Sequence, residues 1–160
     1  YNGEDYVYQL VVFADMKDRF GSTTYAQQSG LLVAKQYVVA GKKDSAKSAL
    51  TWVSEQSSDV GYQALAKLRL AAILMDAKNY DGALNLLNGS FPAGFDALVA
   101  DRKGDVMLLQ GNKAQAVQEY EKALRLFEVR TEYRRLVEVK LNALGVDVQG
   151  REQGAVASGK

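Results

Sequence analysis

Apolar residues recur at intervals of three and four along most of this chain, the spacing that places side chains on one face of an α-helix. The first such stretch puts Tyr6, Leu10 and Phe13 on one face, and Gly21 follows it at a position suited to a helix C-terminus. Later stretches are separated by short tracts that contain glycine, serine or asparagine. The pattern predicts helices over about 5–20, 24–39, 44–56, 62–78, 81–87, 95–110, 113–129 and 132–144, without a β-sheet.

Three of these stretches align with one another, and they begin at Val33, Leu70 and Lys103. Each places a small residue in one helix and an alanine twelve positions later in the next helix: Ala34 with Ala46, Ala71 with Ala83, and Gly104 with Ala116. Paired helices approach closely only where side chains are small, so these pairs predict helix crossings. Larger residues beside the crossings are predicted to form the core: Tyr37, Leu50, Leu74, Leu87, Met107 and Tyr120.

The three alanines, Ala46, Ala83 and Ala116, lie 37 and 33 residues apart, close to the 34-residue period of the tetratricopeptide repeat. A helix pair of this size cannot bury its apolar face alone, so such pairs stack. We therefore predict an all-α fold, a tetratricopeptide-repeat-like right-handed helical solenoid of antiparallel helix pairs with a C-terminal capping helix. The predicted domain covers 1–146, with repeats at about 27–60, 64–94 and 97–130 and a closing helix over 132–144. The polar, glycine-rich stretch 147–160 is predicted to be a disordered tail.

Composition narrows the function mainly by what it leaves out. The chain has no histidine and no cysteine, which excludes a thiol nucleophile, a disulfide and the usual acid–base group at neutral pH. The formal net charge of +1 provides no general attraction to nucleic acid. No glycine-rich phosphate loop is present. These features predict a non-enzymatic chain with no catalytic residues, no metal and no cofactor, which binds proteins rather than nucleic acid.

In stacked repeats of this kind, the first helix of each pair lines a concave surface. The repeat register places nine candidate partner-binding residues there: Leu31, Lys35, Val38, Leu68, Met75, Asp76, Asp105, Leu108 and Leu109. This set is largely apolar, which suits an amphipathic helix or an extended apolar segment of a partner. Lys35 alone does not make the cluster of polar groups that grips a terminal carboxylate. Alternatively, the closing helix or the N-terminal helix fills this surface itself.

Two other surfaces are candidates for contacts. The first helix is followed by a turn and then by a recognisable pair, so it stands where the second helix of an earlier pair would lie. Its face around Tyr6, Val7 and Leu10 is expected to be exposed or covered by another copy of the chain, which leaves a homodimer through the first helix open. The closing helix carries Arg134 and Arg135, but interleaved glutamates favour a solvated face over a lipid-binding patch.

Four tracts together resemble one family: FADMKDRFGSTTYAQQSGLLVAKQYVVAGKKDSAKSALTWV, AKLRLAAILMDAKNYDGALNLLN, GDVMLLQGNKAQAVQEYEKAL and VEVKLNALGV. Over about 6–146 the chain is similar to the periplasmic domain of the YfgM-type ancillary subunit of the bacterial SecYEG translocon. The resemblance implies a single-pass protein of the bacterial inner membrane, with this domain in the periplasm and the anchor absent from this chain. It also implies three kinds of protein partner, namely the translocon, a membrane-anchored periplasmic chaperone and exported clients.

The chain begins at Tyr1 without an initiator methionine, which indicates a fragment or a processed form. Two functions are open at this point. The first is an interaction module that assists exported proteins at the translocon together with the chaperone. The second is a tetratricopeptide scaffold of the lipoprotein type in cell-envelope or outer-membrane assembly. An apolar span upstream of Tyr1 would favour the first function, and a lipobox cysteine there would favour the second.

Overall fold

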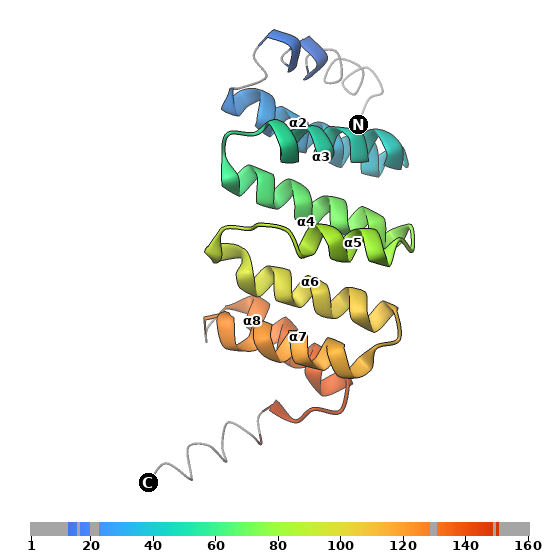
Figure 1. The fold of residues 1–160 in the computed structure, drawn as a ribbon, viewed down its shortest axis with the longest axis vertical. Coiled ribbons are helices and arrows are strands. Elements are labelled where there is room, and N and C mark those ends of the chain that lie inside the picture. The colour runs from blue at the N-terminus through green and yellow to red at the C-terminus, as the bar shows by residue number, and fades with distance from the viewer. Residues whose placement is uncertain (1–12, 16, 20–22, 129–130, 149, 151–160) are drawn as a thin grey trace. The chain divides into compact units, whose positions relative to one another are not determined.

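The computed structural model describes residues 13–15, 17–19, 23–128, 131–148 and 150. Its elements are α2 (Thr24–Val39), α3 (Lys43–Gln56), α4 (Val60–Asp76), α5 (Tyr80–Leu87), the 3₁₀ turn η1 (Ala93–Phe95), α6 (Asp96–Leu109), α7 (Lys113–Leu126) and α8 (Glu132–Ala143). Residues 13–15 and 17–19 are also helical. No β-strand occurs among the described residues, and the prediction of an all-α fold is confirmed (Figure 1). The chain divides into two compact units, Tyr1–Pro92 (unit 1) and Ala93–Lys160 (unit 2).

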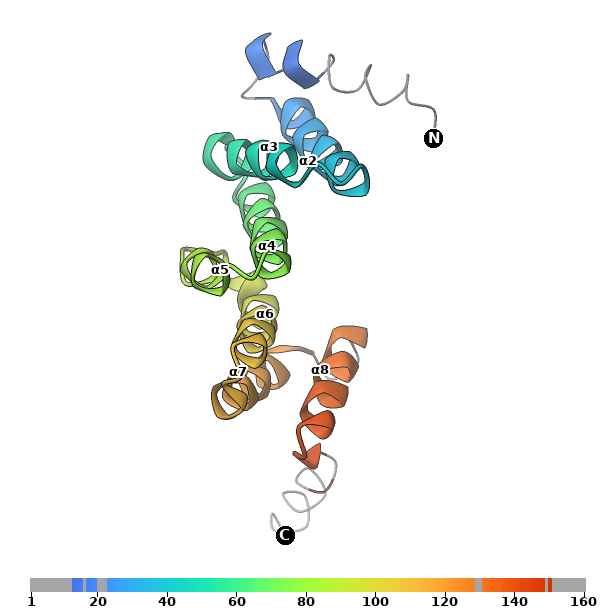
Figure 2. The same cartoon turned by 90° about the vertical axis from the view of Figure 1, so that its right-hand side faces the viewer.

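Unit 1 contains two antiparallel helix pairs, α2 with α3 and α4 with α5, each joined by a short turn (Figure 1). Helix α3 packs against both α2 and α4, and Figure 2 shows α4 next to both of them. The small residues predicted at the crossings, Ala34 with Ala46 and Ala71 with Ala83, are all buried. Methyl side chains allow the backbones to approach closely, so these crossings hold each pair together.

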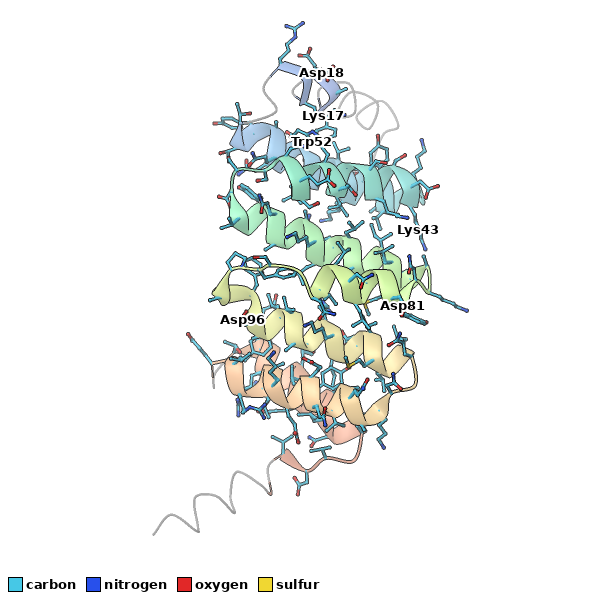
Figure 3. All side chains as sticks on the ribbon, viewed as in Figure 1. Lys17, Asp18, Lys43, Trp52, Asp81 and Asp96 are labelled. Carbon is cyan, nitrogen blue, oxygen red and sulfur yellow. The ribbon has the colours of Figure 1, made fainter. Side chains whose placement is uncertain are left out.

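The first predicted helix is described only in part, and Phe13 shows how it contacts the rest of unit 1. The Phe13 side chain is buried, and its ring meets Trp52 of α3 edge-on with 5.6 Å between the ring centroids. Trp52 lies at the end of unit 1 that carries residues 17–19 (Figure 3). The face around Tyr6, Val7 and Leu10 lies outside the described residues, so the homodimer through the first helix stays a prediction.

Unit 2 consists of η1, the pair α6 and α7, and the closing helix α8. Gly104 of α6 lies against the ring of Tyr120 on α7, and a Cβ added to Gly104 would be 2.5 Å from Cε1 of that ring. The predicted crossing therefore requires glycine at this position. Helix α8 joins the core of unit 2 through Val137 and Leu141, and Val148 is buried in the same core.

The same turn ends α2, α4, α6 and α8, and it relates their residues to one another. In each turn an N–H donates to the carbonyl five residues earlier: Lys42 to Tyr37, Asn79 to Leu74, Asn112 to Met107, and Val146 to Leu141. The four accepting carbonyls lie 37, 33 and 34 residues apart along the chain. Counted from these carbonyls, the residues of α2, α4, α6 and α8 correspond position by position, and this correspondence is here called the shared register. Helix α8 therefore corresponds to the first helix of a further repeat.

Candidate functional site

Helices α2 and α4 enclose a hollow of about 380 Å³, here called the α2/α4 groove. The two helices run in the same direction, because α3 reverses the chain between them. The groove is lined by Ala34, Lys35 and Val38 of α2, Leu50 of α3, and Arg69, Ala72, Ile73 and Asp76 of α4. The four residues of α4 follow the spacing i, i+3, i+4, i+7, so they form one stripe along that helix.

The groove has an apolar floor and a charged rim. Ala34, Leu50 and Ile73 are buried at the floor, whereas the charged side chains are exposed. One guanidinium N–H of Arg69 donates to the main-chain carbonyl of Leu31 at 3.4 Å, which joins α4 to α2 across the rim. An apolar side chain of a partner that packs on this floor would be transferred out of water, and that transfer is favourable.

Three of the nine candidate residues line this groove, namely Lys35, Val38 and Asp76. Lys35 and Asp76 are exposed, and Val38 keeps 47% of its surface accessible to solvent. Met75 is half-buried and does not line the hollow. The repeat register therefore placed three of its candidates beside this hollow, on α2 and α4.

Leu31 and Leu68 lie in the protein interior instead, with only 7% and 8% of their surfaces exposed. Leu31 belongs to the hydrophobic core of unit 1. The reason is geometric, because α2 contacts α4 as well as its own partner α3, and α4 contacts α3 as well as its own partner α5. The buried part of such a helix is consequently wider than the one face that the sequence analysis treated as buried. The assignment of these two leucines to the partner-binding surface is therefore corrected.

In unit 2, the candidates Leu108 and Leu109 are exposed near the end of α6. The shared register places Leu136 of α8 at the position that Arg69 has in α4, and Leu136 is exposed as well. In α8 this position is thus apolar, whereas in α6 the same register position holds Arg102.

Asp105, the remaining candidate, is engaged by side chains of its own unit. Lys140 of α8 donates from Nζ to Asp105 Oδ1 at 2.8 Å and to Asp101 Oδ1 at 2.6 Å. The Tyr120 hydroxyl donates to Asp105 Oδ1 at 2.7 Å, and Arg102 donates to Asp105 Oδ2 at 3.2 Å. Asp105 therefore ties α8 to α6, so the closing helix occupies this part of the predicted binding surface.

Burial raises the pKa of Asp101 above its usual value, because the carboxylate loses hydration there. The hydrogen bond from Lys140 and its positive charge act against this rise and lower the pKa of Asp101. Burial also raises the pKa of the Tyr120 hydroxyl, and its hydrogen bond to Asp105 adds to the rise. Tyr120 stays protonated at neutral pH and serves as a hydrogen-bond donor. This cluster therefore connects α6 with α7 and α8 through polar contacts.

Arg69 is the charged groove residue that sequence reasoning missed. The three-and-four spacing of Arg69, Ala72 and Asp76 was visible in the sequence. The register, however, was read from the small residues at the helix crossings, which define how α4 meets α5. The face that α4 turns toward α2 is rotated from that crossing, and only the packed helices show it.

The described residues contain no group of three or more acidic, histidine or cysteine side chains placed to hold a metal ion. None of their helices has the length and apolar character needed to cross a membrane. The α2/α4 groove itself offers apolar contact on its floor and ionic interaction at its rim.

Comparison with known proteins gives a family and several relatives. The profile of a family described as a tetratricopeptide repeat-like domain matches residues 5–146. A protein of Neisseria gonorrhoeae named "Ancillary SecYEG translocon subunit" is 34% identical over 119 residues, which are 74% of this chain and 57% of that protein. Proteins of the same name from Escherichia coli and Buchnera aphidicola are 28% and 24% identical over 77% of this chain, covering 59% and 63% of their own lengths. The chain thus spans about three-fifths of the length of these relatives.

Proposed function

Because the chain belongs to the tetratricopeptide repeat-like domain family, we propose that it is a non-catalytic module that binds partner proteins in the α2/α4 groove. The observation that carries this proposal is a buried apolar floor beneath an exposed, charged rim. Such a floor supplies binding free energy, and the rim keeps the open groove hydrated when no partner is present. In stacked helix pairs the first helices share one surface, which is where a partner segment docks.

We propose further that the module acts beside the SecYEG translocon as an ancillary subunit, in the periplasm, with an inner-membrane anchor outside this chain. The name shared by the three relatives supports the translocon rather than a scaffold of outer-membrane assembly. A membrane-anchored periplasmic chaperone is the proposed second partner, and exported proteins are the clients that both assist. Exported chains expose apolar segments before they fold, and an apolar groove suits such segments.

The proposal is tested by capture on the immobilised 160-residue chain. Detergent-solubilised membranes containing SecYEG, the periplasmic domain of the candidate chaperone and an unfolded exported protein are applied separately. The chain is expected to retain all three. Val38→Asp should weaken retention at least about fivefold, because a carboxylate beside the apolar floor must lose water when a partner docks.

Val60→Asp is the matched control. Val60 is 60% exposed at the first position of α4 and does not line the groove, so this variant should retain partners as the unaltered chain does. Circular dichroism should show that both variants stay helical. Undiminished capture by Val38→Asp would contradict the groove as the binding site, and no retention of SecYEG by the unaltered chain would contradict the translocon role.

A further inference from the structure

Both cationic residues at the rim of the α2/α4 groove adjoin the same backbone carbonyl of α2, that of Leu31. Arg69 donates to the carbonyl of Leu31, and in an α-helix that carbonyl also accepts the N–H of Lys35, one turn later. The Cα–Cβ bonds of a helix tilt toward its N-terminus, so the Lys35 side chain leaves α2 in the direction away from the end where Asp76 lies. Asp76 follows Arg69 by seven residues on α4, about 10 Å along the axis. The groove therefore has a cationic end and an acidic end, with the apolar floor between them.

These charges are available to a partner. Among the residues that the structure describes, none forms an ion pair with Lys35, Arg69 or Asp76. In unit 2 the shared register puts Asp105 at the position of Lys35, and there the charge is already neutralised by Lys140. Of these two equivalent positions, the one in the α2/α4 groove is the one whose charge has no ion-pair partner among the described residues.

We propose that the α2/α4 groove selects partner segments in which a large apolar side chain lies beside an aspartate or glutamate. The apolar side chain occupies the floor over Leu50 and Ile73, and the carboxylate lies between Lys35 and Arg69. Asp76 repels a second carboxylate at the opposite end, so the segment binds in one orientation. This inference rests on the proposed function of the groove and adds the chemistry of its occupant, an acidic and apolar protein segment.

Three fluorescent peptides of otherwise identical sequence test the proposal. Each has a central leucine, and the residue on one side of it is glutamate in the first peptide, glutamine in the second and lysine in the third. Fluorescence anisotropy follows their binding to the 160-residue chain. The glutamate peptide should bind about three- to tenfold more tightly than the glutamine peptide, the range expected for one or two exposed ion pairs, and the lysine peptide should bind least. The preference should shrink as NaCl rises from about 20 to about 500 mM, because salt screens exposed charges.

Variants of the chain identify the groups responsible. Lys35→Gln should reduce the preference for glutamate, and Lys35→Gln with Arg69→Gln should abolish it. The matched control is Lys43→Gln with Lys122→Gln, which removes two exposed lysines outside the groove and should leave the preference intact; Lys43 lies at the beginning of α3 (Figure 3). Thermal melting checks the fold, and Lys35→Gln alone carries the test if the double variant unfolds.

Equal binding of the three peptides, no binding of any, or an unchanged preference in Lys35→Gln would overturn the proposal. The proposed function is tested separately by the dependence of SecYEG capture on Val38. Capture that depends on Val38 without any preference among the peptides would therefore refute the acidic occupant and leave the groove as the binding site.

Discussion

At the scale of single residues, the turns that end the first helices show where the backbone restricts the choice of side chain. Gly41, Gly111 and Gly145 adopt φ of 72°, 82° and 84° at the equivalent turn position. Lys78 holds that position after α4 with φ of 60°, although it has a side chain. An L-residue in this conformation costs roughly 1 kcal/mol compared with glycine. The α4–α5 turn therefore keeps the geometry of the other repeats at some cost in stability.

Exchanging the residues at two of these turns should change stability in opposite directions. Lys78→Gly is expected to raise the free energy of unfolding by about 0.5–1 kcal/mol, because it relieves the left-handed backbone. Gly111→Lys should lower it by about 1 kcal/mol, since nothing lies within 4 Å of an added Cβ there and the backbone alone resists. Urea denaturation measures both variants. Changes of the same sign would show that the turn conformation is not what limits stability.

Gly104 is a second residue whose size is dictated by its neighbour. An added Cβ would lie 2.5 Å from the Tyr120 ring, and this ring is buried and held by its hydrogen bond to Asp105. Gly104→Ala should therefore destabilise the protein by about 1–3 kcal/mol, outweighing the higher helix propensity of alanine. The midpoint of urea denaturation should fall. A stabilised variant would mean that Tyr120 can move aside at little cost.

At the scale of elements, α8 depends on a polar fastening in addition to apolar packing. Lys140 reaches Asp101 and Asp105 on α6, residues that lie 39 and 35 positions earlier in the chain. Lys140→Met should lower the free energy of unfolding by about 1–2 kcal/mol, because it leaves a buried carboxylate without its cation. The loss is moderate because the lysine site is partly solvated. Hydrogen exchange of the α8 amides should accelerate. Lys122→Met, on the exposed side of α7, is the control expected to leave exchange unchanged.

The same cluster predicts a pH dependence with a definite sign. The pKa of Asp101 is raised in the folded protein above its usual value of 3.8, chiefly by burial. The folded state therefore holds this proton more tightly than the unfolded chain does. The stability that protonation of Asp101 contributes is complete below about pH 3.8 and is lost as the pH rises through the folded-state pKa.

Asp101→Asn removes this titration and isolates its effect. The free energy of unfolding of the variant minus that of the unaltered protein should increase as the pH rises from about 3.8 through the folded-state pKa of Asp101, and then level off. Chemical denaturation at a series of pH values from about 3 to 7 measures the difference. A difference that is constant or falls with pH would contradict the raised pKa.

At the scale of the whole molecule, stacked helix pairs are expected to respond to damage locally. Ala83 is buried at the crossing of α4 and α5, and Ala83→Leu should cost about 1–3 kcal/mol by forcing the two helices apart. Each pair contacts only its neighbours, so amide exchange should accelerate first in α4 and α5 and later in the rest of unit 1. The helices of unit 2 should keep their protection. A uniform acceleration in both units would show that the chain unfolds as one cooperative body.

The amino-acid sequence by itself determined the helical periodicity and the small residues at the crossings, and it placed the ends of α2 to α8 to within about three residues. These features depend on neighbours within one helix or on residues twelve positions away, as Ala71 and Ala83 illustrate. It also placed Lys35, Val38 and Asp76 on one surface of α2 and α4, and these three residues line the α2/α4 groove.

Only the tertiary structure decided which of these side chains line the α2/α4 groove. Leu31 and Leu68 are buried because a first helix packs against two neighbours, and the rotation that this requires cannot be deduced from spacing within one helix. The same packing brought Arg69 to the rim of the groove. Lys140 meets Asp105 because α8 folds back beside α6, a contact between residues that are 35 positions apart. Local spacing thus dictates which face of a helix is apolar, whereas the burial or exposure of each residue at the edge of that face depends on contacts with helices distant in the sequence.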